Sequence, residues 1–414
     1  MIAFGVGSAV AAVAGSEEVL VAARVIQGAG GAALIALSLA ITSHAFPDSL
    51  QAKALGIWAA VSAVALAIGP LVGGALIEAA SWRWIFWVNL PVLATGIAVL
   101  TLAGEESRDE TAPRRVDAVG VGVLGAALTA IVLALIEADD WGFQSAETLG
   151  VLAFGLALLV VFWWVERRVA NPLVDFSLFR NGPYLGASAA GFALVGAYWV
   201  VIFFQPQYLQ DILDHTAIAA GVLILPITAP MVFFSPFSGR VIGRFGARGT
   251  MTVGMLCGVA GLILQARVDA HSDYASLLPG FLLFGISLAL VYAPMSTAAM
   301  VAMPRAKAGI ASGVLAMNRC LAGALLLAIS GALFQGSLPD ATEAAASAGP
   351  RAFTDALSDA LLAPIVVVAL GALITWLLVR DPRLEAARAA EEPAAPVSAT
   401  ADLQHHLHHR RFHL

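Results

Sequence analysis

Two arginines lie in stretches that are otherwise apolar enough to cross a membrane. Arg24 lies in LVAARVIQGAGGAAL and Arg319 in SGVLAMNRCLAGAL. On a helix, Arg24 would share one face with residues three, four and seven positions later, which are Gln27, Gly28 and Gly31. A charged side chain inside lipid is costly and usually faces a cavity or a partner. Arg24 is therefore a candidate for proton transfer, with an interfacial arginine that reaches the headgroups as the alternative.

Arg319 follows Asn318 near the inner third of a long apolar stretch. One interpretation is a partnership with a backbone carbonyl or a carboxylate that fixes helix packing. The other is a role in coupling, and the residues leave both open. With Gln27, the two arginines make up the predicted proton-coupling set: Arg24, Gln27 and Arg319.

Aromatic and amide side chains gather in residues 184–209. Together they would suit a cavity for bulky lipophilic or cationic molecules, since aromatic faces attract cations. Interfacial anchoring near the outer end of a helix is the alternative. The predicted substrate-cavity residues are Tyr198, Trp199, Phe203, Gln205 and, from the later stretch, Asn318.

A run of small residues marks GIWAAVSAVALAIGPLVGG, residues 56–74. Ala65, Gly69 and Gly73 are four apart and would line one helix face, which lets another helix backbone come close. Pro70 removes a backbone donor and bends the helix. Small residues at this spacing are also common in helical membrane proteins generally. The set forms one motif: Gly56, Ala65, Gly69, Pro70, Gly73 and Gly74.

A second glycine-rich motif is basic and lies between two apolar stretches, in GRVIGRFGAR. Its glycines allow a tight turn between helices, and its arginines would hold the loop at the inner membrane face. An ordinary basic inner loop is the alternative. The motif consists of Gly239, Arg240, Gly243, Arg244, Gly246 and Arg248.

The elements that must position these residues are membrane-spanning helices. Hydrophobic residues make up 60% of the 414 residues and charged residues 12%, with a mean hydropathy of +0.86. This composition excludes a soluble globule and predicts an all-α polytopic membrane protein. With about 20 apolar residues needed per span, eleven full spans are expected: 20–43, 54–78, 84–103, 117–137, 147–165, 184–209, 216–238, 250–268, 276–298, 308–334 and 361–379. Residues 1–14 are apolar but short for a span.

The distribution of lysine and arginine predicts the orientation. Basic residues concentrate in alternate loops, from Lys53 through Arg240 to Arg380, whereas the opposite loops are acidic or nearly neutral. The positive-inside rule then places the C-terminus in the cytoplasm. The chain shows no basic patch for nucleic acid, no Walker-type phosphate loop, no metal-ligand spacing and no nucleophile–histidine–acid set in the spans, so it is not expected to be an enzyme or to hold a cofactor or metal.

These motifs resemble those of the 14-span drug:proton antiporters of the major facilitator superfamily. The run from Gly56 to Gly74 is similar to the antiporter motif of the family's fifth span, with Ala65 where the family usually has glycine. Arg24-x-x-Gln27-Gly-x-Gly is similar to the fourth-span motif, whose arginine is held to take part in proton transfer. The GRVIGRFGAR loop resembles the second copy of the superfamily's cytoplasmic loop motif, with Gly243 in place of the usual acid. The resemblance implies that the antiporter-motif helix keeps the two halves of the carrier in contact and closes the leak path.

The register of these motifs implies that the family's first two spans are absent and that the chain is an N-terminally truncated carrier. Residues 1–103 would be the remnant of the N-terminal bundle, family spans three to six, and residues 104–180 would hold two inserted spans with their loops. Residues 181–380 would form the C-terminal six-helix bundle and residues 381–414 a disordered cytoplasmic tail. The family's first span carries an acid linked to proton coupling, so residues 1–414 alone are expected to transport poorly. Full-rate transport by the purified chain would contradict this expectation.

The function that the resemblance implies is proton-driven export of small lipophilic or cationic drugs across the plasma membrane. The partners would be a small-molecule substrate, protons and the lipid bilayer, with the proton gradient as energy source and no nucleic acid. Two alternatives are open: export of one specific metabolite or antibiotic, and a truncated remnant that does not transport. The sequence predicts neither the substrate nor the oligomeric state.

Overall fold

The computed structural model describes residues 1–45, 48–103, 117–142, 144–169, 172–234, 237–303, 308–338 and 344–379. Within these ranges every regular element is a helix. The prediction of an all-α fold is confirmed, and it follows from the membrane environment. Lipid offers no hydrogen-bond partners, so each spanning segment must satisfy its own backbone groups.

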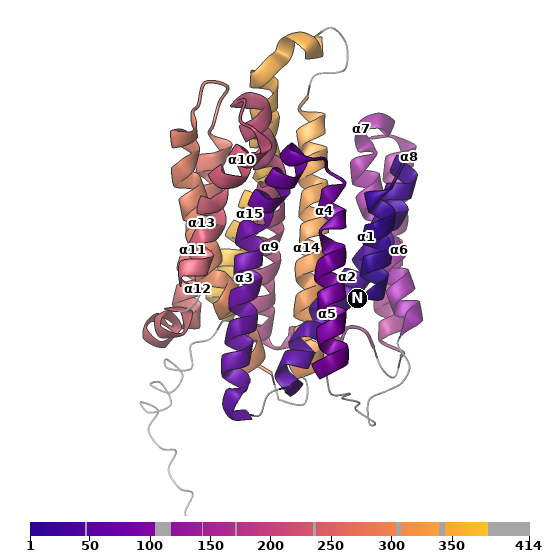
Figure 1. Ribbon diagram of the computed structural model, residues 1–414, viewed down its shortest axis with the longest axis vertical. Helices are drawn as coiled ribbons and strands as arrows, with labels where there is room; N and C mark the ends of the chain where they lie inside the picture. The colour runs from indigo at the N-terminus through magenta and orange to yellow at the C-terminus, as the bar shows by residue number, and fades with distance from the viewer. Residues whose placement is uncertain are drawn as a thin grey trace, which may run out of the picture. The chain divides into compact units, whose positions relative to one another are not determined.

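The first five helices form what we call the N-terminal group. They are α1 (Ile2–Ala12), α2 (Glu17–Ala45), α3 (Asp48–Ala79), α4 (Trp84–Trp87) and α5 (Asn89–Ala103). α1 packs along α2 and also contacts α4 and α5. α3 runs beside α10 and α11 of the second half of the chain (Figure 1). This helix is therefore where the first part of the chain meets the last.

Two antiparallel helices follow, joined by a short one, and we call them the hairpin: α6 (Ala118–Ile136), α7 (Ala138–Trp141) and α8 (Ala146–Glu166). Asp117 caps α6 by accepting from the N–H of Gly120 at 2.8 Å, and Ser145 caps α8 through the N–H of Thr148 at 3.0 Å. Such caps satisfy backbone donors that a helix start leaves unpaired. α6 and α8 pack closely because a Cβ on Gly155 would lie only 2.7 Å from Ile131 Cγ1. The hairpin coincides with the two predicted inserted spans.

The remaining elements form the C-terminal group. They are η1 (Phe176–Arg180), α9 (Gly182–Gln207), η2 (Tyr208–Ile212), α10 (Ala217–Leu223), α11 (Leu225–Phe234), α12 (Ser238–Ala266), α13 (Tyr274–Val301), α14 (Ala308–Gly336) and α15 (Ala344–Leu378). α9 packs against α13, α14 and α15, and α12 packs against α13 and α15 (Figure 1). Phe281 and Phe284 of α13 and Tyr184 of α9 are fully buried among them.

Glycines allow α12 and α13 to approach closely. A Cβ on Gly261 of α12 would lie 2.7 Å from the backbone nitrogen of Phe284 and 2.8 Å from the carbonyl oxygen of Gly280. No side chain fits between the two backbones at this point. Helices in membranes associate mainly through such van der Waals contact, because lipid tails are as apolar as the side chains.

Among the described residues, nine helices are long and apolar enough to cross a membrane, or ten if the bent pair α10–α11 counts as one span. They coincide with ten of the eleven predicted spans. The eleventh, residues 54–78, falls on α3, which is helical throughout its length. The predicted boundary after residue 180 falls between η1 and α9. The boundaries after residues 103 and 380 adjoin residues outside the described ranges, as does the predicted tail, residues 381–414, and all of the boundaries stay predictions.

Candidate functional site

A chain of hydrogen bonds connects three helices of the N-terminal group. Arg24 Nη1 donates to Gln27 Oε1 within α2. Gln27 Nε2 donates to Ser8 Oγ of α1 at 2.7 Å, and Asn89 Nδ2 of α5 lies 3.4 Å from the same Ser8 oxygen. We call Arg24, Gln27, Ser8 and Asn89 the polar chain. It joins the Arg24 guanidinium to the Asn89 amide at the start of α5 through two buried side chains, Gln27 and Ser8.

Close backbone packing between α1 and α2 holds the polar chain in place. A Cβ on Gly7 would lie 2.5 Å from the backbone nitrogen of Gln27, and a Cβ on Gly30 would clash with the backbone of Phe4. Gln27 is consequently only 3% exposed. A buried amide that lost its partners would cost free energy, so this geometry is well specified.

Arg24 lies at the exposed end of the polar chain, with its guanidinium carbon 5.9 Å from the centre of the Phe86 ring. A guanidinium remains charged in proteins and only donates hydrogen bonds. Arg24 therefore supplies a fixed positive charge, and Gln27 and Ser8 supply groups that both donate and accept. The structure thus joins a fixed charge, an amide and a hydroxyl in one hydrogen-bonded chain.

The structure joins Arg24 and Gln27 by a hydrogen bond, and of the two glycines expected on their face, Gly31 lies beside Phe4, whose ring is 3.4 Å from an added Cβ. Gly28 has no atom within 4 Å of an added Cβ, whereas Gly30 and Gly7 make the close contacts. Ser8 and Asn89 were missed. The signal that would have found Ser8 is the stripe of small buried residues in α1: Gly7, Ser8, Ala11 and Ala12.

Arg83 strengthens the same region. Its Nη2 donates to the carbonyl oxygen of Ala14 at 3.0 Å, and its guanidinium carbon lies 4.4 Å from the centre of the Trp82 ring. This bond ties the junction before α4 to the end of α1. The Trp-rich junction therefore contributes a specific contact in addition to any interfacial anchoring.

The antiporter-motif helix α3 contacts α10 with its backbone, but through an unexpected face. A Cβ on Gly74 would clash with the carbonyl of Ala217, and a Cβ on Gly221 would lie 2.8 Å from the carbonyl oxygen of Pro70. Gly69 and Gly73 have no atom within 4 Å of an added Cβ, and Ala65 is exposed. Of Gly56 the structure describes only the helical backbone.

The predicted cavity residues of α9 divide between two faces. Tyr198 and Gln205 are buried in the C-terminal group, and neither amide atom of Gln205 has a hydrogen-bond partner. Trp199 and Phe203 point outward, with 47% and 50% of their surfaces exposed. The Trp199 indole covers Gly323 of α14, where a Cβ would lie 2.6 Å from Cδ1. Four residues of one helix thus do not line one cavity.

Arg319 and Asn318 also point in different directions. The Arg319 guanidinium carbon lies 5.5 Å from the centre of the Tyr292 ring of α13. Asn318 Nδ2 donates to the backbone oxygen of Ser188 in α9 at 2.8 Å and lies 3.4 Å from Ser188 Oγ. Asn318 therefore fastens α14 to α9, and Arg319 reaches toward α13.

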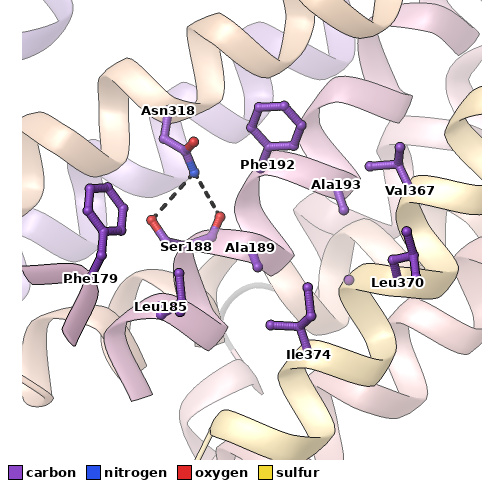
Figure 2. Close-up of a pocket in the computed structure, with 11 residues that line it drawn as sticks. Phe179, Leu185, Ser188, Ala189, Phe192, Ala193, Asn318, Val367, Leu370 and Ile374 are labelled. Carbon is purple, nitrogen blue, oxygen red and sulfur yellow. Dashed lines mark hydrogen bonds between the residues drawn. The ribbon is translucent and has the colours of Figure 1, made fainter. Parts of the chain in front are cut away.

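A pocket of about 290 Å³ opens between α9, α14 and α15 (Figure 2). Asn318 and Ser188 are its polar residues, and Figure 2 shows the two hydrogen bonds that join them. The remaining wall is apolar: Phe179, Leu185, Ala189, Phe192, Ala193, Val367, Leu370, Gly371 and Ile374. A single polar pair in an apolar wall suits a small lipophilic molecule.

The basic loop motif is helical except at one residue. Gly246 breaks α12 with φ 76° and ψ 162°, a conformation that favours glycine. Arg248 stacks on Trp376 of α15, with the guanidinium carbon 3.9 Å from the ring centre, and Arg244 lies over Phe245 at 5.5 Å. The Arg248 contact joins α12 to α15, whereas the Arg244 contact lies within α12. Of Gly239, Arg240 and Gly243 the structure describes only the backbone.

Comparison with known proteins gives a consistent result. The Major Facilitator Superfamily profile matches residues 1–327. The multidrug resistance protein Stp of Mycobacterium tuberculosis is 34% identical over 88% of this chain and 67% of its own length. The tetracenomycin C resistance and export protein of Streptomyces glaucescens is 32% identical over 81% of this chain and 63% of its own length. The chain thus spans about two thirds of the length of these relatives.

Solved structures agree on the fold. An auto-inhibited peptide transporter of the POT family superposes with a TM-score of 0.57, covering 91% of this chain and 80% of its own, at 16% identity. A bacterial homologue of the lysosomal transporter Spinster, inward-facing and unoccupied, gives a TM-score of 0.57 over 92% and 81% of the two chains, also at 16% identity.

Proposed function

Because the chain belongs to the major facilitator superfamily, a family of multi-pass membrane transporters and not of enzymes, we propose that it serves proton-coupled export of small lipophilic or cationic molecules. Export would proceed across the plasma membrane, with the C-terminus in the cytoplasm. Its relatives include a multidrug resistance protein and a drug efflux pump, which supports the direction of transport. The proton gradient would supply the energy.

The polar chain of Arg24, Gln27, Ser8 and Asn89 is the observation that carries the coupling part of the proposal. A charged residue in a span is costly unless it has a task or a partner, and here it is joined to a buried amide and hydroxyl. Protonation of another group in the carrier would change the electrostatic potential at the Arg24 guanidinium. Protons and substrate would then favour different conformations, which is the requirement for exchange.

The pocket between α9, α14 and α15 supports the substrate class. Its apolar wall and its single polar pair fit a small lipophilic molecule better than a strongly polar one (Figure 2). We expect Asn318→Leu to weaken binding of a lipophilic probe by about tenfold, the loss of one buried hydrogen-bonding pair. Substitution of Gln207, which bonds only within its own helix, is the matched control.

The decisive experiment uses the purified chain in liposomes with an imposed pH gradient and a fluorescent lipophilic cation. We expect slow gradient-driven movement of the dye, in line with the poor transport expected of residues 1–414 alone. Arg24→Gln should lower it at least about tenfold because the polar chain loses its charge. Arg267→Gln, in an exposed loop, is expected to leave the rate unchanged. Equal rates for all three proteins would contradict the proposed role of Arg24.

A second candidate function is export of one specific antibiotic, which the tetracenomycin C relative favours. The same liposomes separate the two functions. Competition among unrelated dyes supports broad export. Saturable movement of a single antibiotic that unrelated dyes do not inhibit supports dedicated export. Binding without any movement would instead support a non-transporting chain.

A further inference from the structure

The base of the hairpin brings two carboxylates together. Asp117 precedes α6, and its Oδ1 accepts from the N–H of Gly120 at 2.8 Å. Glu166 ends α8, and its Oε2 accepts from the N–H of Val174 at 3.0 Å. One oxygen of each carboxylate therefore has a backbone donor. The start of α6, the end of α8 and the segment that leads into η1 therefore meet at this pair of carboxylates.

The second oxygen of each carboxylate is buried and has no hydrogen-bond partner in the structure. These atoms are Asp117 Oδ2 and Glu166 Oε1, and Glu166 as a whole is only 3% exposed. Both oxygens lie beside Gly120, and a Cβ added to Gly120 would clash with both. The two side chains also interact directly with each other.

Two ionised carboxylates in this position would repel each other and leave two buried acceptors unsatisfied, which is costly. One proton shared between the carboxylates removes the repulsion and satisfies both acceptors, because the protonated oxygen donates a hydrogen bond to the oxygen of the other carboxylate. A metal ion fits less well. Hard cations take six or more oxygen ligands, and the part of the chain that the structure describes holds no group of three or more His, Cys, Asp or Glu side chains that could bind a metal ion.

We propose that Asp117 and Glu166 share one proton, and that this proton fastens the base of the hairpin to the segment around Val174 that enters the C-terminal group. The junction is closed when the pair holds the proton and loosens when both groups are ionised. It lies on the side of the arginine-rich loops, so it responds to the pH of that side. Proton binding here is separate from the coupling proposed for Arg24, which lies in another group of helices.

The described charged groups near this pair make other contacts or are exposed. The Arg167 and Arg168 guanidinium carbons lie 4.7 and 3.5 Å from the ring centres of Trp163 and Trp164. Asp175 accepts from the N–H of Ser177, and Arg180 is exposed. α14 packs against α6, and its Arg319 lies over Tyr292. Arg114 and Arg115, which precede Asp117, lie outside the described residues.

Hydrogen exchange of the full chain in lipid nanodiscs tests the proposal, with rates corrected for the intrinsic dependence on pH. We expect the peptide covering residues 172–178 to exchange about tenfold faster at about pH 9 than at about pH 5. This factor corresponds to a difference of about one unit between the pKa of the carboxylate pair in the closed form and in the open form. The peptide around Phe284, in the core of the C-terminal group, should show no such change.

Two conservative substitutions sharpen the test. Glu166→Gln and Asp117→Asn each keep the acceptor for the backbone N–H and place an N–H where the proton would be. Both variants are expected to remain protected at every pH, whereas Asp175→Asn should retain the wild-type dependence on pH. A pH-independent wild type, or variants that keep its pH dependence, would overturn the proposal. Protection restored at high pH by added divalent cation would replace the proton with a metal ion and also overturn it.

Discussion

The N-terminal group and the C-terminal group are stabilised in different ways. Half of the most apolar window of α13 is buried, and for the window that includes α9 the fraction is 72%, whereas none of the window Trp84–Leu102 is buried. The largest fully buried side chains, such as Phe204, Phe281 and Phe284, all lie at or beyond Leu178. The N-terminal group instead has the polar chain, the Arg83 bond and close contacts at Gly7 and Gly30.

This difference shows that a helix in lipid can be positioned without a large apolar core. Burial of an apolar side chain gains little when the alternative is lipid, so packing contacts and hydrogen bonds determine which helices associate. The C-terminal group relies on many packing contacts, each weak. The N-terminal group relies more on a few polar contacts and on close backbone approaches at glycines.

The largest effect is expected from the C-terminal core. Phe284→Ala should lower the free energy of unfolding by about 3–5 kcal/mol, because it leaves a cavity among closely packed helices. Phe203→Ala, at a half-exposed position of α9, should cost less than about 1 kcal/mol. Denaturant titration in mild detergent measures both. Equal losses would show that packing does not distinguish buried from exposed positions.

The junction between the two groups should rank second. Gly74→Val places a side chain against the Ala217 carbonyl of α10 and is expected to cost about 1–3 kcal/mol through overpacking. Gly69→Ala, one turn away with no atom within 4 Å of its Cβ, should be neutral or stabilising, since alanine favours the helix. A stability loss at Gly69 as large as that at Gly74 would contradict the observed face of α3.

The polar chain should rank third in stability. Gln27→Leu removes the bonds to Arg24 and Ser8 and is expected to cost about 1–2 kcal/mol. Gln210→Leu, where the amide bonds only to Pro206 of the preceding turn, is the control. Thermal unfolding of both variants compares them directly. A smaller loss at Gln27 than at Gln210 would mean that α1 and α2 are held by their glycines alone.

The smallest effect concerns pH and the loop between α12 and α13. Hydrogen bonds from the His271 N–H and the Ser272 hydroxyl lower the pKa of Asp269. A lowered pKa stabilises the folded protein above the unfolded value of about 3.9, and that stabilisation disappears as the pH falls through the folded value. Asp269→Asn should slightly flatten the acid side of the stability profile. An unchanged profile would show that this loop contributes nothing to acid stability.

The sequence predicted most of the fold, since apolar stretches of about 20 residues must become helices in lipid. It did not predict which face of a helix packs. α3 is apolar on all sides, so hydropathy does not distinguish the face of Ala65 and Gly69 from the face of Pro70 and Gly74. Partners far apart in sequence were also missed: Ser8 and Asn89 meet only because α1 lies between α2 and α5. Gln27 was found because its partner Arg24 is one turn away.

The contact of α3 with α10 also has a mechanical consequence. At Gly74 and Gly221 the two backbones touch without an intervening side chain, so no rotamer has to change when one helix rolls over the other. Rotation about such a point requires little side-chain rearrangement, whereas sliding or separation of the two helices breaks contacts along the whole α3–α10 interface. We therefore expect this contact to resist translation of α3 along α10 more than rotation about it.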